Sequence, residues 1–328
     1  MKRVLVRTSV GSLTVLGLDD VRMEVFPTTI YLLQYSPNGC LGGCRFCPQS
    51  VVNIGASKSF VSRVPWPLVD LDSIADRLGK HNSSVRRVCI QSILKPGWKE
   101  EFLDIIHVLR QYSNVPISAA VNLVDKDFLS KLYDLGVDFV GIGLDAASRD
   151  VFIEMGKPGT WDAYMRFIES AVQIFGSRSV VVHLIVGLGE EEYELYRLME
   201  ELYGMGADVA LFAYTPSPGV LIGLRSPSIY KYRRAQLVRF FLSKGYSLEE
   251  IVSLVDGRVV FRKCVVDVVS KRPLEVFDAF LTSGCPGCNR PFYNESPRGP
   301  IYNFPSREML DKWRNVLVNE IIEAVKNW

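Results

Sequence analysis

The stretch TTIYLLQYSPNGCLGGCRFC, residues 28–47, joins a short apolar run to three closely spaced cysteines. The run at its start is rich in β-branched and large apolar side chains, which indicates a buried β-strand. Cys40, Cys44 and Cys47 follow in a loop that also contains several glycines. Because glycine lets a loop wrap closely around a bulky group, we expect this loop to hold a ligand at the end of the strand.

Similar apolar runs recur at intervals of roughly 25–35 residues, with amphipathic stretches such as 100–112 and 125–136 between them. This alternation predicts βα units, and the continuous apolar character of the runs predicts parallel strands covered on both faces. We therefore expect an α/β fold, a partial (βα)6 TIM-like barrel over residues 28–224. A doubly wound open sheet is the alternative. The expected strands are residues 28–35, 86–93, 115–121, 137–144, 179–186 and 207–214.

The two ends of the chain do not follow this repeat. Residues 1–27 alternate apolar and polar side chains, which predicts an N-terminal strand hairpin. Residues 225–328 predict a C-terminal extension. Its expected parts are helices over 230–245, 247–257 and 306–328, a strand over 257–269, and a long irregular segment over 284–305.

Composition excludes several classes of protein. The chain has 328 residues, of which 48% are hydrophobic and 23% charged, and its net charge is +2. This is ample for a buried core, and it gives no reason to expect nucleic-acid binding. The chain has no apolar run long enough to span a membrane. Its start is basic like that of a signal peptide, but its apolar residues alternate with polar ones and Asp19-Asp20 follow, so a strand hairpin fits better. We expect a cytoplasmic protein that binds neither nucleic acid nor membrane.

Four kinds of site would explain the spacing Cys-x3-Cys-x2-Cys: a disulfide, a zinc site, a redox dithiol or an iron–sulfur cluster. Clustered cysteines in a large intracellular chain favour a metal or a catalytic role. A tetrahedral zinc ion needs a fourth ligand, and no histidine lies within thirty residues of the three cysteines. Three thiolates suggest a 4Fe–4S cluster with one iron left open, although zinc and structural thiols remain alternatives.

The motif Cys-x3-Cys-x-aromatic-Cys after the first strand of a βα barrel resembles the signature of the radical S-adenosylmethionine (radical SAM) superfamily. The resemblance implies that Cys40, Cys44 and Cys47 bind a catalytic 4Fe–4S cluster, whose open iron is chelated by S-adenosylmethionine. It also implies the reaction: reductive cleavage of the cofactor gives a 5′-deoxyadenosyl radical, which removes hydrogen from an inert carbon.

Further stretches resemble the same superfamily, namely GLDAAS (143–148), HLIVGLGE (183–190) and FAYTPSPG (212–219). Ile185, Gly187 and Glu190 match the motif on the fifth strand, where His183 replaces the usual glycine. His183 either points into the barrel as a functional group or is a hydrogen-bonded core residue. The resemblance implies that the cofactor is bound by Phe46, Gln91, Ser92, Asp145, Arg166, Ile185 and Glu190; a helix N-cap for Asp145 and a surface position for Arg166 are the alternatives.

Cys264, Cys285 and Cys288 form a second set in the extension. After a radical SAM core, this set suggests an auxiliary 4Fe–4S cluster, with zinc or an unmetallated dithiol as alternatives. The candidates for its fourth ligand are Ser283, Ser296 and Arg290.

The remaining cysteine, Cys89, lies in a stretch (86–102) that resembles biotin synthase, in which the matching cysteine binds an auxiliary cluster. Ser118 and Val181 occupy the positions of that enzyme's other cysteines. We therefore expect Cys89 to be a small buried apolar side chain.

The segment CPGCNRPFYNESPRGP (285–300) resembles the archaeal two-component lipoyl synthases. This resemblance implies sulfur insertion into an octanoyl chain on a carrier protein, with the auxiliary cluster as the sulfur source. The implied partners are a second radical SAM subunit, the octanoylated carrier protein and an electron donor such as ferredoxin. A radical SAM enzyme of another class, such as one forming C–C bonds, and a non-catalytic metal-binding partner protein are the alternatives.

The basic side chains of the first helix of the extension suggest a docking face for an acidic carrier, or simply a solvated surface. They are Lys231, Arg233, Arg234 and Arg239.

Overall fold

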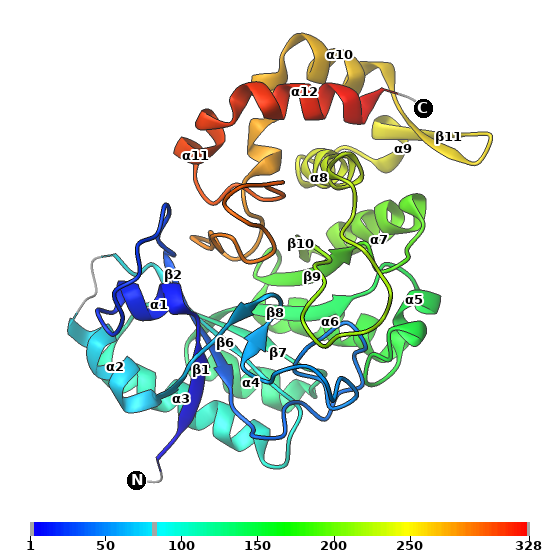
Figure 1. The fold of residues 1–328 in the computed structure, drawn as a ribbon. Helices are drawn as coiled ribbons and strands as arrows, with labels where there is room; N and C mark the ends of the chain where they lie inside the picture. Colours follow the sequence, from blue (N-terminus) through cyan, green and yellow to red (C-terminus); the bar gives the residue numbers. More distant parts are fainter. Residues whose placement is uncertain (1–2, 81–83, 327–328) are drawn as a thin grey trace.

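The computed structural model describes residues 3–80 and 84–326, and a β-sheet forms its centre (Figure 1). Over these residues the sheet has eight strands in the order β10-β9-β8-β7-β6-β2-β1-β5. From β2 to β10 the neighbours pair in parallel and follow one another along the chain. The parallel strands are β2 (Thr29–Gln34), β6 (Arg87–Gln91), β7 (Ile117–Val121), β8 (Val137–Asp145), β9 (Val180–Val186) and β10 (Asp208–Ala213).

Helices connect the parallel strands and lie around the outside of the sheet in Figure 1. Strand order that follows chain order, with no reversal, is that of a barrel and not of a doubly wound sheet. The predicted partial (βα)6 barrel is therefore confirmed, and each expected strand agrees with an observed one to within two residues. The helices are α2 (Leu71–Lys80), α3 (Trp98–Tyr112), α4 (Lys126–Asp134), α5 (Arg149–Glu154), α6 (Trp161–Phe175) and α7 (Glu192–Gly204).

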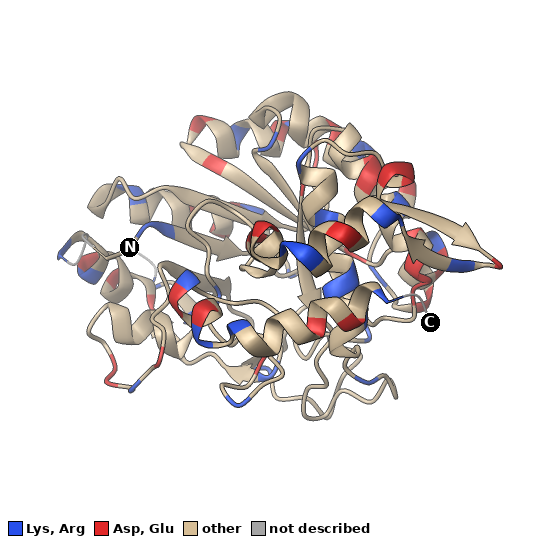
Figure 2. Cartoon of the chain, turned by 90° about the horizontal axis from the view of Figure 1, so that it is seen from above, with Lys and Arg blue, Asp and Glu red and all other residues tan. Residues whose placement is uncertain are grey.

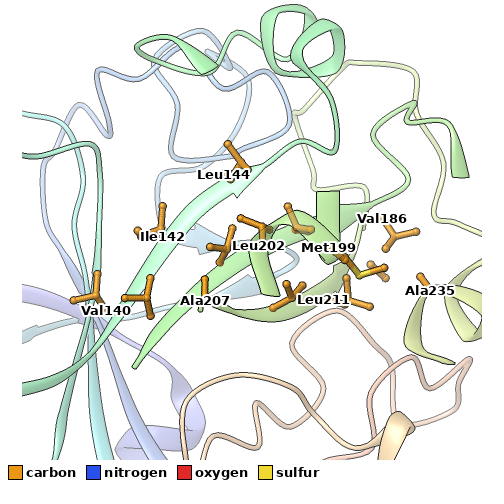
Figure 3. Close-up of a cluster of buried hydrophobic side chains, with 14 of the residues drawn as sticks. Val140, Ile142, Leu144, Val186, Met199, Leu202, Ala207, Leu211 and Ala235 are labelled. Carbon is orange, nitrogen blue, oxygen red and sulfur yellow. The ribbon is translucent and has the colours of Figure 1, made fainter. Parts of the chain in front are cut away.

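Alternate side chains of the strands point to the two faces of the sheet: one face packs against the helices and the other borders the inside of the barrel. Figure 3 shows Val140, Ile142 and Leu144 of β8 in the same buried cluster as Met199 and Leu202 of α7. Burial of these outer-face side chains supplies the main stabilisation of the barrel. Towards its end the inner face of β8 carries Gly143 and Asp145 instead, which leaves room for a cavity inside the barrel.

The N-terminal segment is not the strand hairpin that the alternation predicts. It forms a strand, β1 (Leu5–Thr8), followed by a short helix, α1 (Val10–Val15). Ser9 caps this helix, because its side chain accepts a hydrogen bond from the Ser12 amide. β1 instead pairs antiparallel with β2 and with β5 (Leu68–Asp70), and so extends the sheet beyond the barrel strands. A second short pair, β3 (Phe60–Val61) and β4 (Val64–Pro65), precedes β5.

The C-terminal extension differs from prediction between residues 247 and 271. A one-turn helix leads into a hairpin of β11 (Val252–Val255) and β12 (Arg258–Phe261). Asp256 and Gly257 both have positive φ, 50° and 76°, which is the geometry of a two-residue hairpin turn that Asp-Gly favours. The extension comprises α8 (Ile229–Ser243), α9 (Leu248–Ile251), the hairpin, α10 (Lys263–Lys271), the 3₁₀ segment η1 (Pro273–Phe280), α11 (Arg307–Lys312) and α12 (Arg314–Val325).

Two of the basic residues of α8, Arg233 and Arg234, are held by contacts inside the protein. The Arg233 side chain is 1% exposed, and it donates hydrogen bonds to Glu320 and to the carbonyls of Ile301 and Tyr302. Arg234 pairs with a glutamate of α7 and donates to two further carbonyls. These two cations therefore join the extension to the barrel and to itself, so neither is a free charge on the surface of this helix.

Charged residues of both signs are interspersed over the elements in Figure 2. Among the described residues, no helix combines the length and the apolar character needed to cross a membrane.

We expect Arg233→Met to lower the free energy of unfolding by about 3 kcal/mol, because it removes the cation that pairs with Glu320 and donates to the buried Ile301 carbonyl. Arg149→Met is the matched control, since its ion pair with Asp162 is more than half exposed on both sides and should contribute little. Anaerobic urea unfolding of the metal-free chains measures both. Equal midpoints for the two variants would contradict the internal role of Arg233.

Candidate active site

The barrel encloses a cavity of about 560 Å³, within the range of small-molecule sites. Side chains from all six parallel strands line it, together with the loop after β2 and the segment 283–294 of the extension. Its wall includes Tyr31, Cys89, Gln91, Ala120, Asp145, His183, Ile185 and Phe212.

The cysteine loop, residues 39–53, follows β2 and closes on itself. The Cys40 amide donates to the Gln49 carbonyl at 2.7 Å. Gly39 has φ of +77°, and a Cβ atom there would lie 2.4 Å from the same carbonyl oxygen. A side chain at residue 39 would therefore force this loop apart, and glycine is required.

The three thiols of this loop face the cavity. Cys40 Sγ accepts hydrogen bonds from the amides of Gly42, at 3.4 Å, and Leu94, at 3.3 Å. Burial raises the pKa of the Cys44 thiol and raises that of Cys47 to about 12. Soft sulfur ligands with backbone donors directed at sulfur fit an iron–sulfur cluster, and binding would release the thiol protons.

A buried lysine that we did not single out from the sequence faces this loop. The Lys157 ammonium, between α5 and α6, donates to Asp145 Oδ2 at 2.6 Å and to the Gly143 carbonyl at 2.7 Å. Burial alone would lower the pKa of Lys157. Asp145 and Cys44 together raise it by more than burial lowers it, so the net shift is upward and the ammonium stays charged. It supplies a fixed positive charge beside the thiols. In the sequence it resembles any loop lysine, and no pattern marks it.

The structure brings several predicted cofactor-binding residues to this cavity. Phe46 comes from the cysteine loop, Gln91 and Ser92 from the end of β6, Asp145 from the end of β8 and Ile185 from β9. Their arrangement at the carboxyl ends of parallel strands is where barrels place their ligands.

Two predicted cofactor-binding residues lie elsewhere. Arg166 is exposed on α6 and is not part of the cavity wall, so the nearby buried cation is Lys157 instead. The Glu190 carboxylate is fully buried, accepts hydrogen bonds from the amides of Gly187 and Leu188, and pairs with Lys231. Glu190 therefore shapes the turn after β9 and does not reach the cavity.

His183 lines the cavity and packs edge-on against Phe212, with ring centroids 5.2 Å apart. Burial, and then the nearby Arg290 cation, lower the pKa of His183 to about 4. The imidazole is therefore neutral near pH 7. Of the two alternatives for this residue, the one that points into the barrel agrees with the structure.

The structure does not bring the three cysteines of the predicted second set together. Cys285 and Cys288 line the cavity, but Cys264 is exposed on α10, where its Sγ lies 3.6 Å from the Glu250 carbonyl oxygen. Cys264 belonged to a predicted strand, and its place on a helix after the β11–β12 hairpin carries it away from the other two. Cys89 of β6 lines the cavity instead, so its prediction as a purely apolar side chain is incomplete.

The segment 283–294 covers the side of the barrel between β10 and β2. Leu211 of β10 donates its amide to Ser283 Oγ at 3.0 Å, and the Arg290 amide donates to Tyr31 Oη of β2 at 3.0 Å. The Arg290 guanidinium lies 3.8 Å from the centre of the Phe212 ring. The same segment therefore closes the cavity and contributes part of its wall.

We expect Gly39→Ala to prevent the cysteine loop from binding iron, because its Cβ would collide with the Gln49 carbonyl. Gly97→Ala is the control: it has a similar φ of +67° but open space around it, so it should cost about 1 kcal/mol of stability and keep its iron. Iron analysis after anaerobic reconstitution compares the two. Normal iron content in Gly39→Ala would show that the loop tolerates a side chain there.

The neutral state of His183 predicts a loss of stability in acid. In the unfolded chain its pKa is about 6.5 and in the folded chain about 4, so the unfolded state binds more protons between these values. Stability should therefore fall as pH drops from about 6.5 towards 4, by about 2 kcal/mol at pH 5. Comparing urea unfolding of the parent and His183→Gln at pH 7 and pH 5 isolates this contribution. Identical pH dependence in both would refute it.

Known proteins are similar to this chain in part of its sequence, and a solved structure is similar in fold. A biotin synthase from Methanococcus aeolicus is 25% identical over 55% of this chain and 54% of its own. A probable GTP 3′,8-cyclase from Saccharolobus solfataricus is 23% identical over 60% of each. The chain thus spans less than two thirds of these relatives. Among solved structures, a methylornithine synthase (PylB) matches with a TM-score of 0.51 at 16% identity, over 65% of this chain and 62% of its own.

The family model of the radical SAM superfamily matches residues 35–202, which begin just before the cysteine loop and end within α7. That match covers about half of the chain and contains the whole cysteine loop and the strand ends around it. The chain belongs to the radical SAM superfamily.

Proposed function

We propose that this chain is a radical SAM enzyme that inserts sulfur, using a second iron–sulfur cluster as the sulfur source. One observation carries the proposal: the cysteine loop and the pair Cys285 and Cys288 open into the same cavity. A substrate in that cavity would lie between the two sets of thiols. Proximity of this kind is what a transfer between two bound groups requires.

The residues of the cysteine loop fit the group that the family implies. Cys40, Cys44 and Cys47 would hold the 4Fe–4S cluster. Together with S-adenosylmethionine, the bound cluster supplies a 5′-deoxyadenosyl radical able to remove hydrogen from an unactivated carbon. Lys157 adds a fixed positive charge beside Cys44. Gln91 and Ser92 offer hydrogen-bonding groups at the strand ends, where a polar cofactor needs them.

The cavity wall protects reactive carbon from side reactions. Much of it is apolar, with Leu33, Val61, Trp66 and Ile93 among its members. The segment 283–294 closes its side, which limits the entry of water. An apolar wall also suits a hydrocarbon substrate, because burial of methylene groups is favourable.

The substrate that we propose is an octanoyl chain on a carrier protein, as in the archaeal two-component lipoyl synthases. Support comes from the apolar cavity wall and from the likeness of residues 285–300 to that family. The chain would act with a second radical SAM subunit and receive electrons from a donor such as ferredoxin. Because the arginines of α8 are engaged internally, the carrier would dock on another surface.

We expect Cys285→Ala to abolish sulfurated product while cofactor cleavage continues, since only the second set of thiols loses a member. The assay supplies S-adenosylmethionine, a chemical reductant and a synthetic octanoyl-lysyl peptide to the reconstituted chain. Mass spectrometry then counts 5′-deoxyadenosine and sulfurated peptide. Unchanged sulfurated product in the variant would exclude the second cluster as the source. Cleavage without sulfurated product in the parent would favour another reaction class.

A further inference from the structure

We propose that Cys89, Cys285 and Cys288 together bind the second iron–sulfur cluster, and that Cys264 is not a ligand of it. This inference rests on the proposed function, because it names the thiols that would hold the sulfur-donating cluster. The sequence predicted Cys264, Cys285 and Cys288 as the ligands, whereas the fold brings Cys89 to the cavity beside Cys285 and Cys288. Cys89 would then be a cluster ligand.

The strand register places Cys89 between the residues that hold the other two thiols. Tyr31 of β2 and Ser118 of β7 are its direct neighbours in the parallel sheet. Tyr31 Oη lies 3.4 Å from Cys288 Sγ, and Ser118 hydrogen-bonds Cys285. Side chains at one level of adjacent parallel strands point to the same face. Cys285 and Cys288 therefore approach Cys89 from its two sides.

The loop that carries Cys285 and Cys288 is fixed to the beginnings of the same strands. Arg87, at the start of β6, donates to the Pro286 carbonyl at 3.0 Å. Thr28, just before β2, donates its amide to Asn289 Oδ1 at 3.0 Å and its hydroxyl to the Gly287 carbonyl. The first cysteine loop instead follows the end of β2. The two sets of thiols thus belong to opposite ends of the barrel strands, and the cavity extends between them.

The surroundings of this second set suit an anionic cluster. Arg87 is 5% exposed and pairs through two nitrogens with Asp138, so a buried cation borders the thiols. Arg290 Nε is buried and has no hydrogen-bond partner. An unpartnered buried donor is costly, and an anionic sulfur ligand in the cavity would satisfy it.

A cluster fits these thiols better than a single ion does. Within residues 3–80 and 84–326, no three His, Cys, Asp or Glu side chains are close enough together to share one metal ion. The irons of a 4Fe–4S cluster are separate atoms, so each takes its own thiolate. Three thiolates would leave one iron without a cysteine ligand, next to the cavity.

Cys264 has none of these features. It is exposed, lies on α10 and is absent from the cavity wall. Figure 1 shows α10 beside α12 at the outer edge of the extension, away from β6 and β7. Substitution of Cys264 therefore provides a matched control at a cysteine of the same chain.

The test measures the second site alone. In a full-length chain carrying Cys40→Ala, Cys44→Ala and Cys47→Ala, iron and sulfide bound after anaerobic reconstitution report only the remaining cysteines. We expect about four irons per chain, with the electron paramagnetic resonance signal of a reduced 4Fe–4S cluster. Adding Cys89→Ser should remove most of this iron and the signal, whereas adding Cys264→Ser should leave both unchanged. Urea unfolding of the metal-free variants checks that each one folds, and Cys89→Ala serves as a second variant if the serine form does not.

The outcomes separate the ligand set from the reaction. Iron that survives loss of Cys89 but disappears with Cys264 overturns the inference and leaves sulfur insertion open. Absence of iron and sulfide in the triple variant also overturns it. Iron that depends on Cys89, in a chain whose intact form makes no sulfurated peptide, supports the ligand set and refutes the proposed reaction.

Discussion

An incomplete barrel has to cover the gap between its first and last parallel strands. In this chain β10 is the last strand, and its free edge would expose unpaired backbone groups to solvent or to other chains. The segment 283–294 fills the gap. On one side its Ser283 hydroxyl accepts a hydrogen bond from the Leu211 amide, and on the other side its Arg290 amide donates to the Tyr31 hydroxyl. Because this covering is irregular and not a strand, its side chains reach into the cavity. The need to close the barrel thus brings Cys285 and Cys288 inside it.

The extension can cover the barrel only if it is fixed to the strands and to its own helices, and buried arginines make several of these contacts. Arg87 joins β6 to the Cys285–Cys288 loop, and Arg233 joins α8 to the segment before α11 and to α12. Each has several oxygen partners, which offsets the cost of removing its charge from water. Arg233 and Arg234 are therefore part of the internal structure of the extension.

The barrel could be read from the sequence because each of its strands is a short apolar run between amphipathic segments, and this pattern is local. The cysteine loop could be predicted for the same reason, since its spacing is local too. Asp256-Gly257, a favoured two-residue turn between β-branched runs, indicates the β11–β12 hairpin. The prediction instead placed residues 247–257 in a helix and residues 257–269 in a strand. Lys157 and the internal position of Arg233 depend on contacts between distant segments, and no local pattern contains them.

Cys89 shows why distance along the chain is a poor guide to a shared site. Arg87 and Pro286 are 199 residues apart in sequence and yet are in direct contact, while Cys264 is far closer to Cys285 in sequence and lies on another side of the extension. Loop-closure entropy grows only slowly with length, so a long separation adds little cost once the barrel has ordered the chain between the two ends. The long separation in sequence therefore does not disfavour Cys89 as the partner of Cys285 and Cys288. Cys264 is disfavoured instead by its exposed position on α10, away from the cavity wall.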